Sequence, residues 1–158
     1  MRKPVVISAL SSTAVLGLGG ALTTIGPWYF SLRKPSWQPP GWAFGPAWTV
    51  IGGTTAWAAV TGWDALTTRR QRTTLLCLFA ANGAVNVAWT VLFFNRQRPD
   101  LALREVVLLW LSIAALLVDL ATVSRRAAWL MAPYLAWVSF AAYLNLVIVR
   151  LNPSVRPS

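Results

Sequence analysis

The sequence predicts an all-α integral membrane protein, a bundle of five transmembrane helices that forms a single domain over residues 1–158. Hydrophobic residues make up 56% of the chain and charged residues 11%, whereas a soluble domain carries about a quarter charged residues. The basic residues lie in short clusters between long apolar runs, which is typical of loops that flank membrane spans. Little of the surface can therefore face water.

Five apolar runs are long enough to cross the bilayer, whose hydrocarbon core of about 30 Å requires about 20 residues of helix. The expected spans are 5–26, 44–63, 74–94, 101–123 and 127–149. The first span begins like a signal peptide, but its apolar run is too long and Ile25-Gly26-Pro27 is a poor cleavage site. Pro, Arg and Asp fill the breaks between spans, as loops require.

The net charge of +10 raises the question of nucleic acid as a partner. The clusters of basic residues at the span ends indicate lipid headgroups instead, so the expected partner is the lipid bilayer and no nucleic acid. With five spans, each side of the membrane receives seven basic residues. The charges therefore predict neither an orientation nor a particular host membrane.

The break between the first two spans is rich in Trp and Pro. Within residues 28–49 it contains Trp28, Trp37, Trp42, Trp48, Pro35, Pro39, Pro40 and Pro46. Proline restricts the backbone, and Trp presents a large flat surface. Two interpretations are open: an aromatic belt at the membrane interface, or a stiff lid over an apolar ligand.

The third expected span has two distinct faces. Asn82, Asn86, Trp89 and Phe93 share one face by helical spacing, and the asparagines should point into the bundle because Asn is costly in lipid. Small residues form an opposite stripe of Ala80, Ala84 and Ala88, which allows close approach of a second subunit or of another helix of the bundle.

The last expected span carries Tyr134, Trp137, Phe140 and Ala141 on one broad face, which suits either a ligand or helix packing. The chain has no His, and it shows no paired carboxylates, phosphate-binding loop or metal-ligand spacing. No metal site is expected, and hydrolytic and phosphoryl-transfer activities have no support.

The segment WYFSLRKPSWQPPGWAFGPAWT, residues 28–49, resembles the defining segment of the tryptophan-rich sensory protein and translocator protein family, TspO/MBR, also called the peripheral benzodiazepine receptor family. The similarity continues through Asn82 and Asn86 to Pro133-Tyr134-Leu135-Ala136-Trp137 and Leu144-Asn145, so it covers nearly the whole chain.

This resemblance implies a five-helix bundle, commonly dimeric, whose first loop closes over a pocket that takes porphyrins, benzodiazepine-type ligands and, in animals, cholesterol. The implied ligand-binding residues are Trp28, Tyr29, Pro39, Phe44, Trp48, Asn86, Trp89, Phe93, Trp137, Phe140 and Ala141. Some bacterial members are similar in having two tryptophans linked to light-dependent porphyrin breakdown, and the implied catalytic positions here are Trp48 and Trp137. Leu146 stands where the sterol-linked segment needs an aromatic residue, so sterol binding is not implied.

The expected function is that of a membrane receptor or sensor that binds a tetrapyrrole, a porphyrin or haem, and takes part in tetrapyrrole or stress regulation. The alternatives are a carrier of apolar ligands and a light-dependent porphyrin-degrading enzyme. No cofactor is required, and the ligand expected is a protoporphyrin IX-like porphyrin whose propionates could pair with Arg33 or Lys34. The face formed by Ala80, Ala84 and Ala88 suits a homodimer and suits another helix of the bundle equally, so the oligomeric state stays open.

Overall fold

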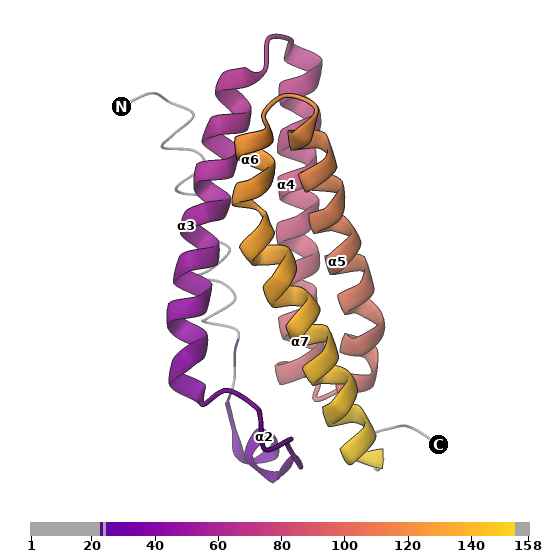
Figure 1. Cartoon of the computed structure of the whole chain (residues 1–158). Coiled ribbons are helices and arrows are strands. Elements are labelled where there is room, and N and C mark those ends of the chain that lie inside the picture. Colours follow the sequence, from indigo (N-terminus) through magenta and orange to yellow (C-terminus); the bar gives the residue numbers. More distant parts are fainter. Residues whose placement is uncertain (1–22, 24, 154–158) are drawn as a thin grey trace.

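The computed structural model describes residue 23 and residues 25–153, and all regular structure in that part of the chain is helical. The elements are α2 (Pro27–Ser31), α3 (Gly41–Ala65), α4 (Arg69–Thr90), the π-helix η1 (Val91–Asn95), α5 (Pro99–Ala121), α6 (Arg125–Leu130) and α7 (Ala132–Leu151). The long helices run side by side, with α6 and α7 following one another, and α2 lies at the lower end of the bundle (Figure 1). The all-helical class is confirmed for these residues.

Three helical stretches in the described part are long and apolar enough to cross a membrane: Arg69–Asn95, which includes η1, Pro99–Ala121, and Arg125–Leu151, which includes the turn at Met131. They cover the predicted spans 74–94, 101–123 and 127–149. The predicted span 44–63 lies within α3, a helix of 25 residues that is not among those three stretches. The predicted span 5–26 lies almost entirely outside the described residues.

Local signals in the sequence explain where these helices begin. The Thr68 hydroxyl accepts a hydrogen bond from the backbone N–H of Gln71, and the Gln71 side chain accepts one from the backbone N–H of Thr68. This capping box starts α4. Ser124 caps α6 through the N–H of Ala127, and Pro99 occupies the first turn of α5, where no N–H partner is needed.

Two of the predicted spans are less regular than the sequence indicates. The span 127–149 is broken at Met131 between α6 and α7, because Pro133 has no N–H to donate to the preceding turn. At the end of α4 the chain widens into η1, where Arg96 N–H donates to the Val91 carbonyl at 2.8 Å. A π-helix of this kind shifts the side chains that follow it around the helix axis.

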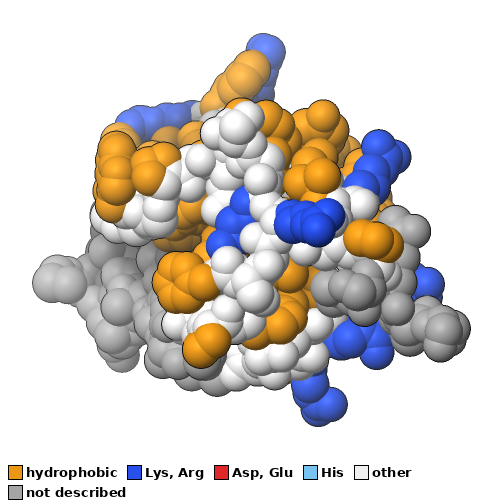
Figure 2. All heavy atoms as spheres, turned by 90° about the horizontal axis from the view of Figure 1, so that it is seen from below, with side chains coloured by type: hydrophobic (Ala, Val, Ile, Leu, Met, Phe, Trp, Pro, Cys, Tyr) orange, Lys and Arg blue, Asp and Glu red, His pale blue; other side chains and the backbone are white. Residues whose placement is uncertain are grey.

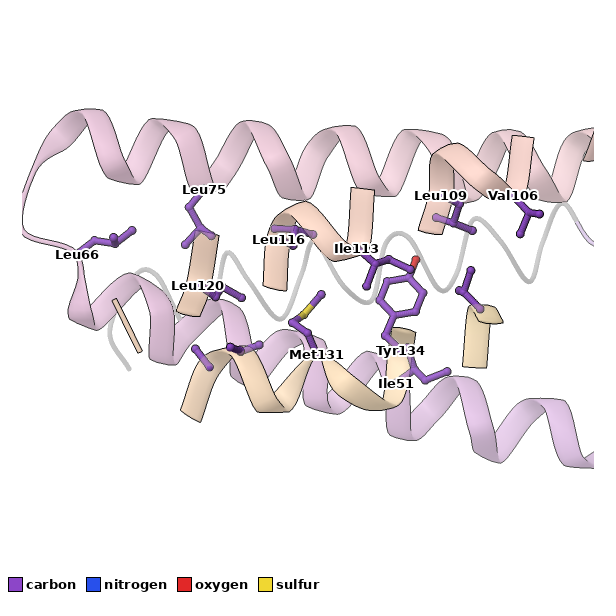
Figure 3. Close-up of a cluster of buried hydrophobic side chains, with 14 residues drawn as sticks. Ile51, Leu66, Leu75, Val106, Leu109, Ile113, Leu116, Leu120, Met131 and Tyr134 are labelled. Carbon is purple, nitrogen blue, oxygen red and sulfur yellow. The ribbon is translucent and has the colours of Figure 1, made fainter. Parts of the chain in front are cut away.

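An aliphatic core fills the upper and middle part of the bundle (Figure 3). Helix α5 is its centre, since it packs against α4, α6 and α7. The buried residues of this core are Ile51, Ala58, Leu66, Leu75, Val106, Leu109, Ile113, Leu116, Leu120, Ala127, Ala128, Met131, Tyr134 and Val138. Tyr134 contributes the single hydroxyl group of the set.

A second cluster, here called the loop-side cluster, lies toward α2. Its buried residues are Leu32, Phe93, Ala102, Leu144 and Ile148. The partly buried residues packed around them are mostly aromatic: Trp28, Tyr29, Phe44, Trp89, Leu92, Phe94 and Phe140. The bundle therefore changes from aliphatic to aromatic filling along its length.

Candidate ligand-binding groove

An apolar groove of about 490 Å³ lies between α3 and α7. Helix α3 contributes Pro46, Ala47, Val50 and Ile51, and α7 contributes Pro133, Ala136, Trp137 and Phe140. Ligand pockets in proteins commonly measure about 300–1,000 Å³, so the groove is large enough for part or all of a drug-sized apolar molecule. Its lining offers ring faces and methyl groups for contact.

Aromatic rings adjoin this groove on both helices. Phe44 of α3 meets Trp137 edge to face, with the ring centroids 5.6 Å apart, and Trp137 lies 5.5 Å from Phe140. Further along α3, Trp48 meets Tyr134 at 6.1 Å, also edge to face. Such contacts hold the indole of Trp137 at the wall of the groove.

Polar side chains of α4 point into the bundle, as predicted. Asn86 donates to the Tyr134 hydroxyl at 2.9 Å, and Asn82 donates to the Ser112 hydroxyl of α5 at 2.8 Å. Both asparagines are buried, with 7% and 5% of their surface exposed. Because a polar group in an apolar interior needs a partner, these bonds link α4 to α7 and to α5.

The rings near α2 form a second group. Trp89 stacks on Phe93 at 5.2 Å, and Trp28 approaches Phe93 edge to face at 6.1 Å. Tyr29 lies 5.7 Å from Phe94. Of the tryptophans in the predicted site, Trp137 lines the groove, Trp48 adjoins it, and Trp28 and Trp89 belong to the loop-side cluster.

The loop between α2 and α3 is attached to α7 by a reciprocal pair of hydrogen bonds. The backbone N–H of Arg33 donates to Asn152 Oδ1 at 2.9 Å, and Asn152 Nδ2 donates to the Arg33 carbonyl, also at 2.9 Å. Trp37 of the loop stacks on Tyr143 at 5.5 Å and meets Phe140 at 6.0 Å. The loop therefore packs directly on the helix that forms one wall of the groove.

Basic groups mark the loop end of the bundle. Viewed from below, hydrophobic and Lys or Arg side chains share the face of the described residues (Figure 2). Lys34 Nζ lies 3.9 Å from the centre of the Tyr29 ring, and partial burial lowers the pKa of this lysine. Arg98 makes a two-pronged ion pair with Asp100, and this hydrogen bonding raises the pKa of the guanidinium.

The predicted site residues fall into neighbouring groups rather than one. Trp137 and Phe140 line the groove, and Phe44 and Trp48 adjoin it through ring contacts. Trp28, Tyr29, Trp89 and Phe93 belong to the loop-side cluster, on which Phe44 and Phe140 also pack. Ala141 follows Phe140 on α7 and is partly buried. Asn86 is bonded to Tyr134 next to Trp48, and Pro39 lies partly buried in the loop.

Two residues of this region, Trp37 and Asn152, are absent from the predicted site. Trp37 belonged to the recognised loop segment, and its position between prolines was the available signal. Asn152 lies at the end of α7, outside every recognised motif, and nothing in the sequence indicates that it reaches Arg33, which is 119 residues away.

Known proteins resemble the chain over nearly its full length. A sequence model described as "TspO/MBR family" matches residues 6–151. The chain belongs to the TspO/MBR family.

Its relatives include the tryptophan-rich protein TspO of Chlorobaculum tepidum, which is 39% identical over 97% of this chain and 100% of its own length. The translocator protein of Sus scrofa is 36% identical, with 95% of this chain and 93% of its own covered. The tryptophan-rich sensory protein of Cereibacter sphaeroides is 35% identical, with 84% of this chain and 82% of its own length covered. The resemblance read from the loop segment is thus confirmed. Membership and the three apolar helices together identify a multi-pass integral membrane protein.

Proposed function

We propose that the protein is a membrane receptor that binds a tetrapyrrole, such as a porphyrin or haem, and related apolar ligands inside its helix bundle. The segment 5–26 completes a bundle of five transmembrane helices, and the Trp/Pro loop acts as a lid over the ligand. Binding alters the attachment of this loop and so serves a sensory role in tetrapyrrole or stress regulation.

The observation that carries the proposal is the groove between α3 and α7, which the loop borders through Trp37. A porphyrin is a broad aromatic plate, and Trp137 and Phe140 present rings to such a plate from α7. Its propionates need cations, and Arg33 and Lys34 belong to the same loop as Trp37.

The test is a titration of the purified protein with protoporphyrin IX, followed by the shift of the porphyrin absorbance and the quenching of Trp fluorescence. We expect saturable binding, and about tenfold weaker binding for Trp137→Ala, because a stacked ring contributes about 1 kcal/mol or more. Trp129→Ala is the matched control, since Trp129 is 73% exposed and lies on α6. Signals that never saturate would argue against a receptor.

Light-dependent breakdown of the porphyrin is a second candidate, because Trp137 lines the groove and Trp48 adjoins it through Tyr134. Under illumination, the Trp48→Phe, Trp137→Phe double variant should then slow the loss of porphyrin absorbance, while Trp129→Phe should not. If porphyrin absorbance is lost at the same rate with the wild type, with the double variant and in detergent alone, the enzymatic function is excluded and the receptor function is retained. Uptake into proteoliposomes would instead indicate a carrier.

We further propose a homodimer through Ala80, Ala84 and Ala88, all of which are exposed on α4. Cys77 is exposed on the same face, two helical turns before Ala84. A membrane-permeant thiol cross-linker should therefore join two copies in the membrane, and Cys77→Ser should abolish the product. A wild-type chain that stays monomeric under these conditions would exclude this face.

A further inference from the structure

The carboxyl group of Glu105 on α5 has no hydrogen-bond partner among the described residues, although both of its oxygens are shielded from the surface. The indole N–H of Trp89 on α4 is likewise buried without an acceptor. Buried polar groups in proteins are nearly always paired, so an unpaired acceptor and an unpaired donor in one bundle require an explanation.

The register of α4 against α5 puts these two groups at the same level. The helices run antiparallel, and the hydrogen bond from Asn82 to Ser112 ties them at one point (Figure 1). Seven residues further along α4 is Trp89, and seven residues back along α5 is Glu105. Since seven residues are close to two turns, both lie on the faces that already meet at Asn82 and Ser112.

Tyr134 of α7 completes the surroundings of this carboxyl. Its hydroxyl accepts the hydrogen bond from Asn86, which lies about one turn before Trp89 on the same face of α4. Glu105 therefore sits where α4, α5 and α7 converge, beside the polar side chains of the bundle interior.

No described cation faces Glu105 from the elements packed on α5. Helix α4 carries no charged residue after Arg72, η1 carries none, and α6 carries Arg125 and Arg126 in its first turn at the opposite end of α5. The titratable residues of α7 are Tyr134, Tyr143 and, in the last turn, Arg150. On α5 itself, Asp100 is paired with Arg98, Arg104 is exposed, and Asp119 is four turns away.

A bare carboxylate in an apolar interior costs several kcal/mol, so a group in this position is stable only with a compensating positive charge. We propose that Glu105 is a cation-accepting site in the membrane interior, where a proton or an alkali metal cation neutralises the carboxylate beside Tyr134 and Trp89. The inference does not depend on tetrapyrrole binding, and it assigns a charge-uptake step to the bundle itself.

Dicyclohexylcarbodiimide tests this site, because the reagent partitions into bilayers and adds to protonated carboxyl groups there. The acid proton moves to a carbodiimide nitrogen and a carboxyl oxygen bonds to the central carbon, so the adduct keeps all atoms of both reactants. The chain has four acidic side chains, Asp64, Asp100, Glu105 and Asp119, which peptide mapping can distinguish. In proteoliposomes at neutral pH without alkali cations, we expect the adduct at Glu105 and none at the three aspartates.

Addition of Na⁺ or K⁺ at fixed pH separates the two sources of charge. Labelling that falls with cation concentration assigns the site to that cation, and labelling that stays constant assigns it to a proton. An unlabelled Glu105 in cation-free buffer, or labelling no stronger than that of the aspartates, would overturn the proposal.

Three variants keep the result interpretable. Glu105→Gln should lose the adduct, Glu105→Asp should retain it, and Asp119→Asn should label like the wild type, with each checked for the helical content of the folded chain. Because the mapping on the wild type already decides the outcome, misfolding of any variant leaves the test intact. Undiminished adduct in Glu105→Gln would show that another group reacts, and would exclude the site.

Discussion

The upper and lower parts of the bundle in Figure 1 differ in what fills them and in how the chain is joined there. Above, Leu75, Leu116, Leu120 and Met131 are almost completely buried, and the chain turns between α5 and α6 through a capped helix start. Below, rings such as Trp28 and Phe93 meet at their edges, and a long loop is tied to α7 by one asparagine.

This difference indicates a division of labour. Aliphatic side chains pack closely without directional bonds, so a small change in their volume alters the stability of the bundle. Such packing suits the part that holds the helices together. Edge-to-face rings and a loop held by few hydrogen bonds can rearrange at lower cost, which suits a part that admits a ligand. Four changes test whether stability and loop attachment separate in this way.

The largest effect is expected from Leu120→Ala in the aliphatic core. Leu120 has no exposed surface, so truncation leaves a cavity and should lower the free energy of unfolding by about 2–5 kcal/mol. Denaturation in detergent by urea or heat measures this loss, and porphyrin affinity should stay unchanged. Val118→Ala, on the exposed face of the same helix, is the control. A loss of affinity equal to the loss of stability would contradict the division.

Overpacking at the same end should have the next largest effect. A Cβ at Gly62 would collide with Leu120 Cδ2, and Leu120 has no room to move aside, so Gly62→Ala should cost about 1–3 kcal/mol. At Gly53, on the same helix, a Cβ would meet nothing within 4 Å. Gly53→Ala should accordingly be neutral or slightly stabilising, and equal thermal shifts for the two variants would refute the packing seen here.

At the loop end, Asn152→Ala should act on the loop and leave the bundle intact. It removes the hydrogen bonds to both backbone groups of Arg33, a loss of about 1–2 kcal/mol in loop attachment. Limited trypsin digestion reports this as faster cleavage after Arg33, with little change in the unfolding midpoint. Asn95→Ala, at an exposed asparagine of η1, should cleave at the wild-type rate. Unchanged cleavage in Asn152→Ala would mean that the loop is held by its rings alone.

The smallest effect concerns pH and Lys34. Burial lowers the pKa of Lys34 below its ordinary 10.5, so the unfolded chain holds this proton at pH values where the folded chain has released it. Stability should therefore rise slightly as pH increases through the window between the lowered pKa and 10.5. Thermal unfolding midpoints measured across this window should depend less on pH in Lys34→Met than in the wild type. Identical profiles would exclude Lys34 as a cause of the pH dependence.

Much of the described fold was predictable because membrane helices carry their signals locally. Apolar runs and the clusters of basic residues between them located the helices of 74–94 and 101–123 to within a few residues. The spacing of Asn82 and Asn86 predicted their burial correctly. The break at Met131 was missed, although Pro133 was visible, because a proline in a membrane helix can also be absorbed as a kink.

The candidate site was predictable in its residue types and less so in its grouping. The loop segment identified the family, and Trp137 and Phe140 do line the groove. That Trp89 and Phe93 belong to a different ring group follows from the packing of η1 and α2, which periodicity along one helix does not describe.

By itself the sequence determined the all-helical apolar class, the family and the inward face of α4, because hydropathy, helical spacing and the Trp/Pro segment are all properties of neighbouring residues. The tertiary structure alone decided that Asn152 holds Arg33, that Trp37 packs on α7, and that the buried Glu105 carboxyl has no hydrogen-bond partner in the described part of the chain. These are contacts between residues far apart in the chain. Their geometry depends on the register and rotation of packed helices, which no local pattern specifies.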